Sequence, residues 1–97
     1  MLYDRDELNK RYDARMEMAV EAERTLQKYG VYGDVEALMY GSKDFVVEIH
    51  WGDWKHEHKR CDWILGGMGY NLVSVDVTED NGSDCYSALR YYRKDVA

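Results

Sequence analysis

The longest regular pattern in the sequence is a helical repeat of apolar residues between residues 8 and 29. Apolar residues recur there three or four positions apart, at Leu8, Tyr12, Met16, Ala19, Ala22, Leu26 and Tyr29. This spacing places them on one face of a helix. Asp4, with Glu7 three residues later, matches a capping box, and Gly30 is typical of a helix end. We therefore predict a helix of about 25 residues, roughly 37 Å long, which should overhang a small sheet.

Two hairpins are predicted from alternating apolar segments. Residues 35–40 and 44–51 flank the glycine turn at residues 41–43, and residues 70–78 and 85–93 flank the turn at residues 80–83. In the second strand, one face carries Phe45, Val47, Ile49 and Trp51. His50 is expected on the opposite, outward face. In the third strand we expect Val73, Val75 and Val77 to point inward.

A second helix is predicted between the hairpins, capped by Asp53 and running to about Leu65, before the glycines at residues 66–69. The element order is therefore αββαββ. We predict an α+β fold in which a four-stranded, mostly antiparallel sheet carries both helices on one face. A length of 97 residues suits a single domain over residues 1–97.

Residues 50–61 contain all three histidines and one of the two cysteines. His58 and Cys61 are three positions apart, so a helix places them side by side, and Cys85 begins the last predicted strand. One hypothesis is a structural zinc site formed by His58, Cys61, Cys85 and a fourth ligand. His56 and His50 are further candidate ligands, although both point away from Cys61. The alternative is that the cysteines are small buried residues and the histidines are polar surface residues.

The motifs of common enzymes are missing from the sequence. The segment His56-Glu57-His58 places its histidines two positions apart, so it is not the HExxH helix of metalloproteases. The glycines at residues 66–69 lack the following Lys-Ser/Thr of a phosphate-binding loop. We predict that the protein has no enzymatic activity.

The charge distribution limits the choice of partner. The formal net charge is −6, and a direct nucleic-acid partner is disfavoured because binding it requires a basic surface. Residues 34–54 carry five acids and one base, and residues 61–89 carry five acids and no base. The negative charge is therefore expected on the sheet and its turns. No apolar run approaches the roughly 20 residues of a membrane span, and no signal pattern begins the chain, so a cytoplasmic protein is expected.

The aromatic composition favours protein binding. The chain has nine tyrosines and one phenylalanine, and tyrosine is enriched at protein interfaces. Acids and tyrosines together suit a partner with a basic groove. The candidate contact residues near the last turn are Asp76, Glu79, Asp80, Asp84 and Tyr86. A second candidate surface is the basic face of the second helix, with Lys55, Lys59, Arg60 and Trp63.

Four acidic stretches carry a resemblance to a known group of proteins: residues 34–36, 44–48, 76–80 and 83–87. With its small size, the chain resembles anti-CRISPR proteins of phages and mobile elements. This resemblance implies an inhibitor that binds a Cas9-type RNA-guided nuclease in the bacterial cytosol and hinders loading of target DNA, as a monomer or homodimer. The alternative is a zinc-stabilised structural or regulatory module of a phage or plasmid, dimeric through the first helix.

Overall fold

The structure, a computed structural model, describes residues 5–49, 54–79 and 86–94; within these ranges the side chains of residues 54–57, 78–79 and 86–87 are left out. Its elements are, in chain order, α1 (Arg5–Lys28), β1 (Asp34–Ala37), β2 (Phe45–Ile49), α2 (Trp54–Gly67), β3 (Tyr70–Glu79) and β4 (Tyr86–Lys94). These bounds agree with the predicted elements to within a few residues. The predicted helix caps, Asp4 and Asp53, lie outside the described residues.

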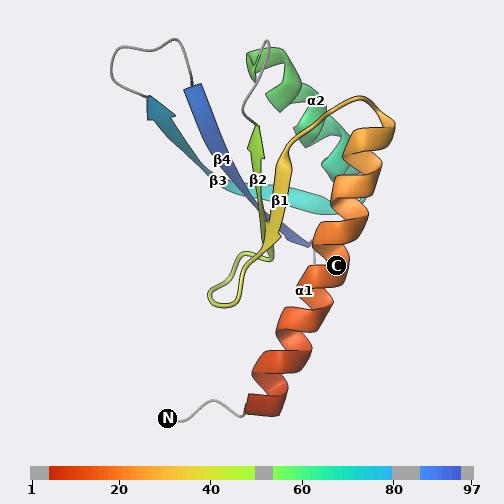
Figure 1. The fold of residues 1–97 in the computed structure, drawn as a ribbon, viewed down its shortest axis with the longest axis vertical. Coiled ribbons are helices and arrows are strands. Elements are labelled where there is room, and N and C mark those ends of the chain that lie inside the picture. Colours follow the sequence, from red (N-terminus) through yellow and green to blue (C-terminus); the bar gives the residue numbers. More distant parts are fainter. Residues whose placement is uncertain (1–4, 50–53, 80–85, 95–97) are drawn as a thin grey trace.

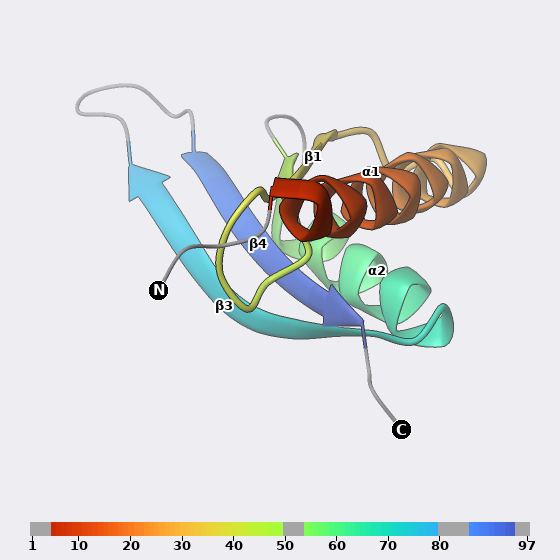
Figure 2. The ribbon, with the colours of Figure 1, turned by 90° about the horizontal axis from the view of Figure 1, so that it is seen from below.

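The four strands form one antiparallel sheet in the order β1-β2-β4-β3. Both helices lie against the same side of this sheet, which is curved around them (Figures 1 and 2). We call the covered side the inner face and the opposite side the outer face. The predicted α+β architecture, with an antiparallel sheet and two helices on one face, is confirmed.

The end of α1 is built as its sequence predicts. Gly30 has a φ of 81°, a conformation that glycine adopts at little cost. The Gly30 N–H donates to the Gln27 carbonyl (3.0 Å), and the Val31 N–H donates to the Leu26 carbonyl (2.9 Å). This is the Schellman arrangement, and its usual apolar contact is present because Leu26 and Val31 are both buried. The chain therefore turns sharply from α1 into β1.

The core lies between the helices and the inner face. It contains Ala19, Ala22 and Leu26 of α1, together with Val31, Phe45, Val47, Ile49, Cys61, Ile64, Leu65, Tyr70 and Tyr92. Phe45 packs edge-on against Tyr70 and stacks on Tyr92. Burial of Phe45, Val47 and Ile49 confirms the inward face predicted for β2.

The N-terminal half of α1 extends past the sheet (Figure 1). Near the middle of α1, two apolar side chains are only partly covered: Met16 is 45% exposed and Val20 is 50% exposed. The prediction that the helix overhangs the sheet is confirmed. Neither helix in the described part of the chain is long and apolar enough to cross a membrane.

Two of the three β3 valines predicted to point inward, Val75 and Val77, lie on the inner face, whereas Val73 falls outside the alternation, and all three are exposed. Val73, Val75 and Val77 are 41%, 37% and 56% exposed. A register shift between Leu72 and Ser74 leaves Val73 as an extra residue, a β-bulge. Val75 and Val77 do lie opposite Arg90 and Ala88, on the inner face. They are exposed because the far end of the β3–β4 hairpin extends beyond both helices (Figure 2).

Candidate functional site

The two central residues of the predicted zinc site, His58 and Cys61, lie on the side of α2 that faces the sheet. His58 is 6% exposed and Cys61 is 0% exposed. Their spacing of three residues does place them on one helix face, as predicted. His58 is buried, so the alternative that it is a polar surface residue is wrong.

A buried polar cluster surrounds Cys61 and is centred on the hydroxyl group of Tyr92. The Tyr92 hydroxyl donates to Asp62 Oδ1 (2.5 Å) and accepts from Arg90 Nε (3.2 Å). Cys61 Sγ lies 3.2 Å from the same oxygen. Because a hydroxyl has one proton, and Asp62 receives it, the Cys61 thiol is the donor to Tyr92. Arg90 also forms an ion pair with Asp62 through its Nε and Nη2 atoms.

The surroundings of Tyr92, Arg90 and the neighbouring His58 shift the pKa of each of these three groups. Burial, the neighbouring Cys61 and the hydrogen bond to Asp62 raise the pKa of Tyr92 far above its ordinary value. Burial and then the positive charge of Arg90 lower the pKa of His58, while Asp62 acts in the opposite direction. For Arg90, burial favours a lower pKa, but the hydrogen bonds to Tyr92 and Asp62 outweigh it and the pKa is raised. Tyr92 and His58 are therefore neutral and Arg90 is charged at neutral pH.

The hydrogen bonds and the ion pair of the buried polar cluster link α2 to β4, so its residues have a structural role. A metal bound to Cys61 needs the thiolate, so the thiol would have to give up its proton and its bond to Tyr92. Among residues 5–49, 54–79 and 86–94, no group of three or more His, Cys, Asp or Glu residues is arranged to hold a metal ion. Cys85 and His50 lie outside the described residues, and the His56 side chain does too. The zinc site therefore stays a prediction.

The outer face of the sheet carries most of the described acids of the strands. The register places Asp34 opposite Glu48, Glu48 opposite Leu89, and Leu89 opposite Asp76. A second row holds Glu36, Val46, Tyr91 and Ser74. We call these four acids, with Val46, Leu89 and Tyr91 between them, the outer acidic face. Asp34 and Glu48 thus lie directly opposite one another, an arrangement of like charges that weakens strand pairing.

Part of the outer acidic face, without Asp76, lines a groove in which apolar and acidic side chains are mixed. Val46, Leu89 and Tyr91 line it together with Asp34, Glu36 and Glu48, and Glu23 of α1 borders it. Positive charge lies toward one end of the face, where the Lys43 ammonium group sits 4.5 Å from the centre of the Tyr91 ring. The groove offers aromatic and aliphatic area surrounded by carboxylates, a combination suited to binding basic side chains with apolar stems.

The predicted contact residues near the last turn can be placed only in part. Asp76 is exposed on the outer face. Asp80 and Asp84 lie outside the described residues. Glu79 ends β3 and Tyr86 begins β4, but their side chains are not described. The acids Asp34, Glu36 and Glu48, which the sequence placed only within broad acidic stretches, are the ones that the register gathers beside Asp76.

The basic surface predicted on α2 is smaller than expected. Lys59 is exposed and Trp63 is 78% exposed, as predicted. Arg60, in contrast, donates through Nη2 to the carbonyl of Tyr29 at the end of α1. Its charge therefore helps to close the α1 C-terminus, where unsatisfied carbonyls attract cations. The Lys55 side chain lies outside the described residues.

A second polar contact between helix and sheet, centred on Arg15, could not be predicted from the sequence because it depends on the fold. Arg15 of α1 is 6% exposed and donates to the carbonyls of Leu38 (2.8 Å) and Gly41 (2.7 Å) and to Asp44 Oδ1 (3.2 Å). Asp44 Oδ2 accepts from the Lys94 N–H (2.7 Å). The Asp44 carboxylate thus joins α1, the β1–β2 connection and β4 through hydrogen bonds. We call this residue a hub, although its acidic stretch suggested a contact with a partner protein.

Comparisons with protein-family models, with curated proteins and with solved structures returned no match for this chain.

Proposed function

We propose that this protein has no enzymatic activity and inhibits a nucleic-acid-handling protein by binding its basic surface through the outer acidic face. The observation that carries the proposal is that four carboxylates surround the apolar strip of Val46, Leu89 and Tyr91 on the side of the sheet opposite both helices. A basic groove that normally holds phosphates would meet carboxylates there instead. The partner's own cations would replace the counterions of the acids.

The specific partner that we propose is a Cas9-type RNA-guided nuclease in the bacterial cytosol, whose DNA-loading channel is positively charged. The chain would act without contacting nucleic acid itself, because its net charge of −6 repels phosphate. The small size, the acidic sheet and the tyrosines support this choice, in line with the resemblance to anti-CRISPR proteins.

Charge reversal on the outer acidic face tests the proposal. Glu36→Lys with Asp76→Lys changes two exposed acids. We expect the affinity for the guide-loaded nuclease to fall by at least about tenfold and the binding to depend less on salt. The matched control is Glu7→Lys with Asp13→Lys, which changes the net charge equally at exposed positions of α1. Equal weakening by both pairs, or by neither, would contradict the proposed surface.

A second set of variants separates the other candidate surfaces. Reversal of Glu79, Asp80 and Asp84 tests the acids near the last turn. Substitution of Lys59 and Trp63 by alanine tests the exposed face of α2. Loss of binding only in the α2 variants would move the proposed interface to that helix.

The alternative, a zinc-stabilised module, is favoured by one observation: His58 and Cys61 share the buried face of α2. We expect about one zinc ion per chain, and a melting temperature that falls on chelation, if Cys85 completes the site. Elemental mass spectrometry on untagged protein measures this. If the protein contains no metal and chelators leave its melting temperature unchanged, the zinc hypothesis is wrong and both cysteines have a structural role.

A further inference from the structure

The edge of β1 that faces away from β2, here called the β1 edge, borders the sheet. Among the described strands, β1 pairs with β2 alone. The Leu38 N–H donates to the Asp44 carbonyl (3.0 Å). This bond shows which residues of β1 direct their backbone groups toward β2. Hydrogen bonding alternates along an antiparallel strand, so Glu36 bonds toward β2, whereas the amide and carbonyl groups of Val35 and Ala37 point outward at the β1 edge.

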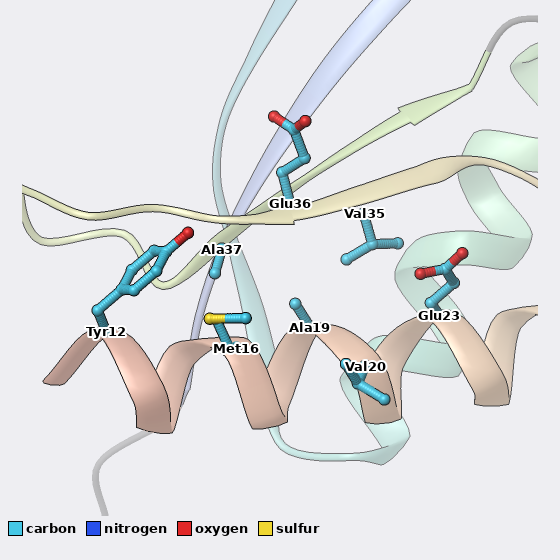
Figure 3. A pocket seen from close by; sticks show the side chains of 8 residues that line it. All are labelled: Tyr12, Met16, Ala19, Val20, Glu23, Val35, Glu36 and Ala37. Atoms are coloured by element: carbon cyan, nitrogen blue, oxygen red, sulfur yellow. The ribbon is translucent and has the colours of Figure 1, made fainter. Parts of the chain in front are cut away.

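A groove lies directly beside this edge, between β1 and α1 (Figure 3). Its floor is formed by Met16, Ala19 and Val20 of α1, and Val35 and Ala37 point down toward the helix. Met16 and Val20 are each about half exposed, at 45% and 50%. We call this feature the edge groove. It leaves apolar area uncovered next to backbone groups that are oriented for strand pairing.

The spacing of the edge groove matches that of a strand. Met16 and Val20 are one helical step of four residues apart, which is about 6 Å along α1. Alternate side chains of a strand are about 6.6 Å apart. Because β1 runs alongside α1 in Figure 3, a strand added at the β1 edge would place successive same-side side chains over Met16 and Val20.

The charge around the edge groove favours a basic occupant. Glu23 and Glu36 border both the edge groove and the outer acidic face, and Asp34 lies on the same strand. Pairing with β1 of a second copy would bring the acids of both strands to the same face, and opposed like charges weaken pairing. A strand whose outward side chains are basic would meet the opposite charge.

We propose that the β1 edge binds an extended basic segment of the partner as a fifth strand of the sheet. Residues of this segment opposite Val35 and Ala37 are apolar and fill the edge groove. The intervening residues are lysine or arginine and face Glu36 and the outer acidic face. This is β-strand addition, in which backbone hydrogen bonds give affinity and alternate side chains give specificity. The inference rests on the proposed function, because it names how that basic partner is held.

A peptide tests the binding mode without the nuclease. The probe is a capped peptide of about ten residues that alternates valine and lysine, and the control has the same composition arranged as one valine block and one lysine block. We expect the alternating peptide to bind at least about tenfold more tightly and to protect the Val35 and Ala37 amides from hydrogen exchange. Equal binding of the two peptides, or unprotected amides, would overturn strand addition.

Two variants make the test specific to the edge. Ala37→Pro removes an outward N–H while leaving the β2 ladder in place, since proline is tolerated at sheet edges. Met16→Lys with Val20→Lys charges the groove at half-exposed positions, and Asn9→Lys with Ala14→Lys adds the same charge at exposed positions elsewhere on α1. Binding of the alternating peptide should fall by about tenfold in Ala37→Pro and in the variant with Met16→Lys and Val20→Lys. It should be retained in the control with Asn9→Lys and Ala14→Lys.

The same variants separate this inference from the proposed function. If outer-face reversal abolishes nuclease binding but Ala37→Pro and the groove variant do not, strand addition is wrong and the acidic-surface proposal stands. If the alternating peptide binds the edge but the nuclease does not bind the protein, the β1 edge is a docking site and the proposed nuclease is wrong.

Discussion

On the inner face of the sheet, the buried cations lie against carboxylates: Arg15 against Asp44 and Arg90 against Asp62. The outer face instead gathers acids from three strands around an apolar strip, with positive charge toward one end. A buried charge must be compensated within the fold, because desolvation is costly. An exposed charge has no such requirement. The inner charges are therefore explained by stability, whereas the outer acids fit the proposed role in binding.

The largest expected difference between the two faces is at Asp44. Asp44→Ala removes the acceptor for Arg15 and for the Lys94 N–H and leaves a buried guanidinium group without its carboxylate. We expect the free energy of unfolding to fall by about 3 kcal/mol. Urea denaturation measures the change. Asp13→Ala, an exposed acid of α1, is the control and should change stability by less than about 0.5 kcal/mol. Similar effects of both substitutions would show that Asp44 is not a hub.

Protonation of His58 at low pH is expected to lower the free energy of unfolding by less than Asp44→Ala does. The pKa of His58 in the fold lies below its ordinary value of 6.5, so the unfolded chain binds a proton more readily than the folded one. Stability from this group is complete above about pH 6.5 and is lost progressively as the pH falls from there through the lower pKa of the folded state. Denaturation at pH 7.5 and 5.5 should show a larger loss for the native sequence than for His58→Gln. Equal losses would mean that His58 is solvated in the fold.

The smallest effect is expected on the outer face. Glu36→Gln with Asp76→Asn removes two exposed charges and keeps the shape of both side chains. The free energy of unfolding should change by less than about 0.5 kcal/mol, while affinity for the basic partner falls. Thermal melting and a binding titration on the same samples measure both quantities. A large loss of stability would break the contrast, because it would give these acids a role in the fold.

Local patterns allowed much of the fold to be predicted. The stripe of α1, its end at Gly30 and the alternation of β2 depend on residues close together in the sequence. The hubs at Arg15 and Asp44 and the cluster around Tyr92 could not be predicted in this way. They depend on the strand order and register, which bring together residues 28 to 50 positions apart.

The candidate sites show the same division. The pairing of His58 with Cys61 on one helix face followed from helix geometry, whereas their burial depended on how α2 packs on the sheet. Acidic character of the sheet was evident in the sequence. The gathering of Asp34, Glu48 and Asp76 on one face required the register. The bulge at Val73 and the limited reach of the helices likewise exposed valines that strict alternation would have buried.

The position of β4 has a consequence for how the chain folds during synthesis. Among the described strands β4 comes last in chain order, yet it lies between β2 and β3 and pairs with both. While residues 86–94 are still inside the ribosome, β2 and β3 have no shared neighbour, and Asp44 lacks the Lys94 amide. The nascent chain can therefore form the helices and the β1–β2 hairpin, but the four-stranded sheet forms only when β4 pairs with both β2 and β3.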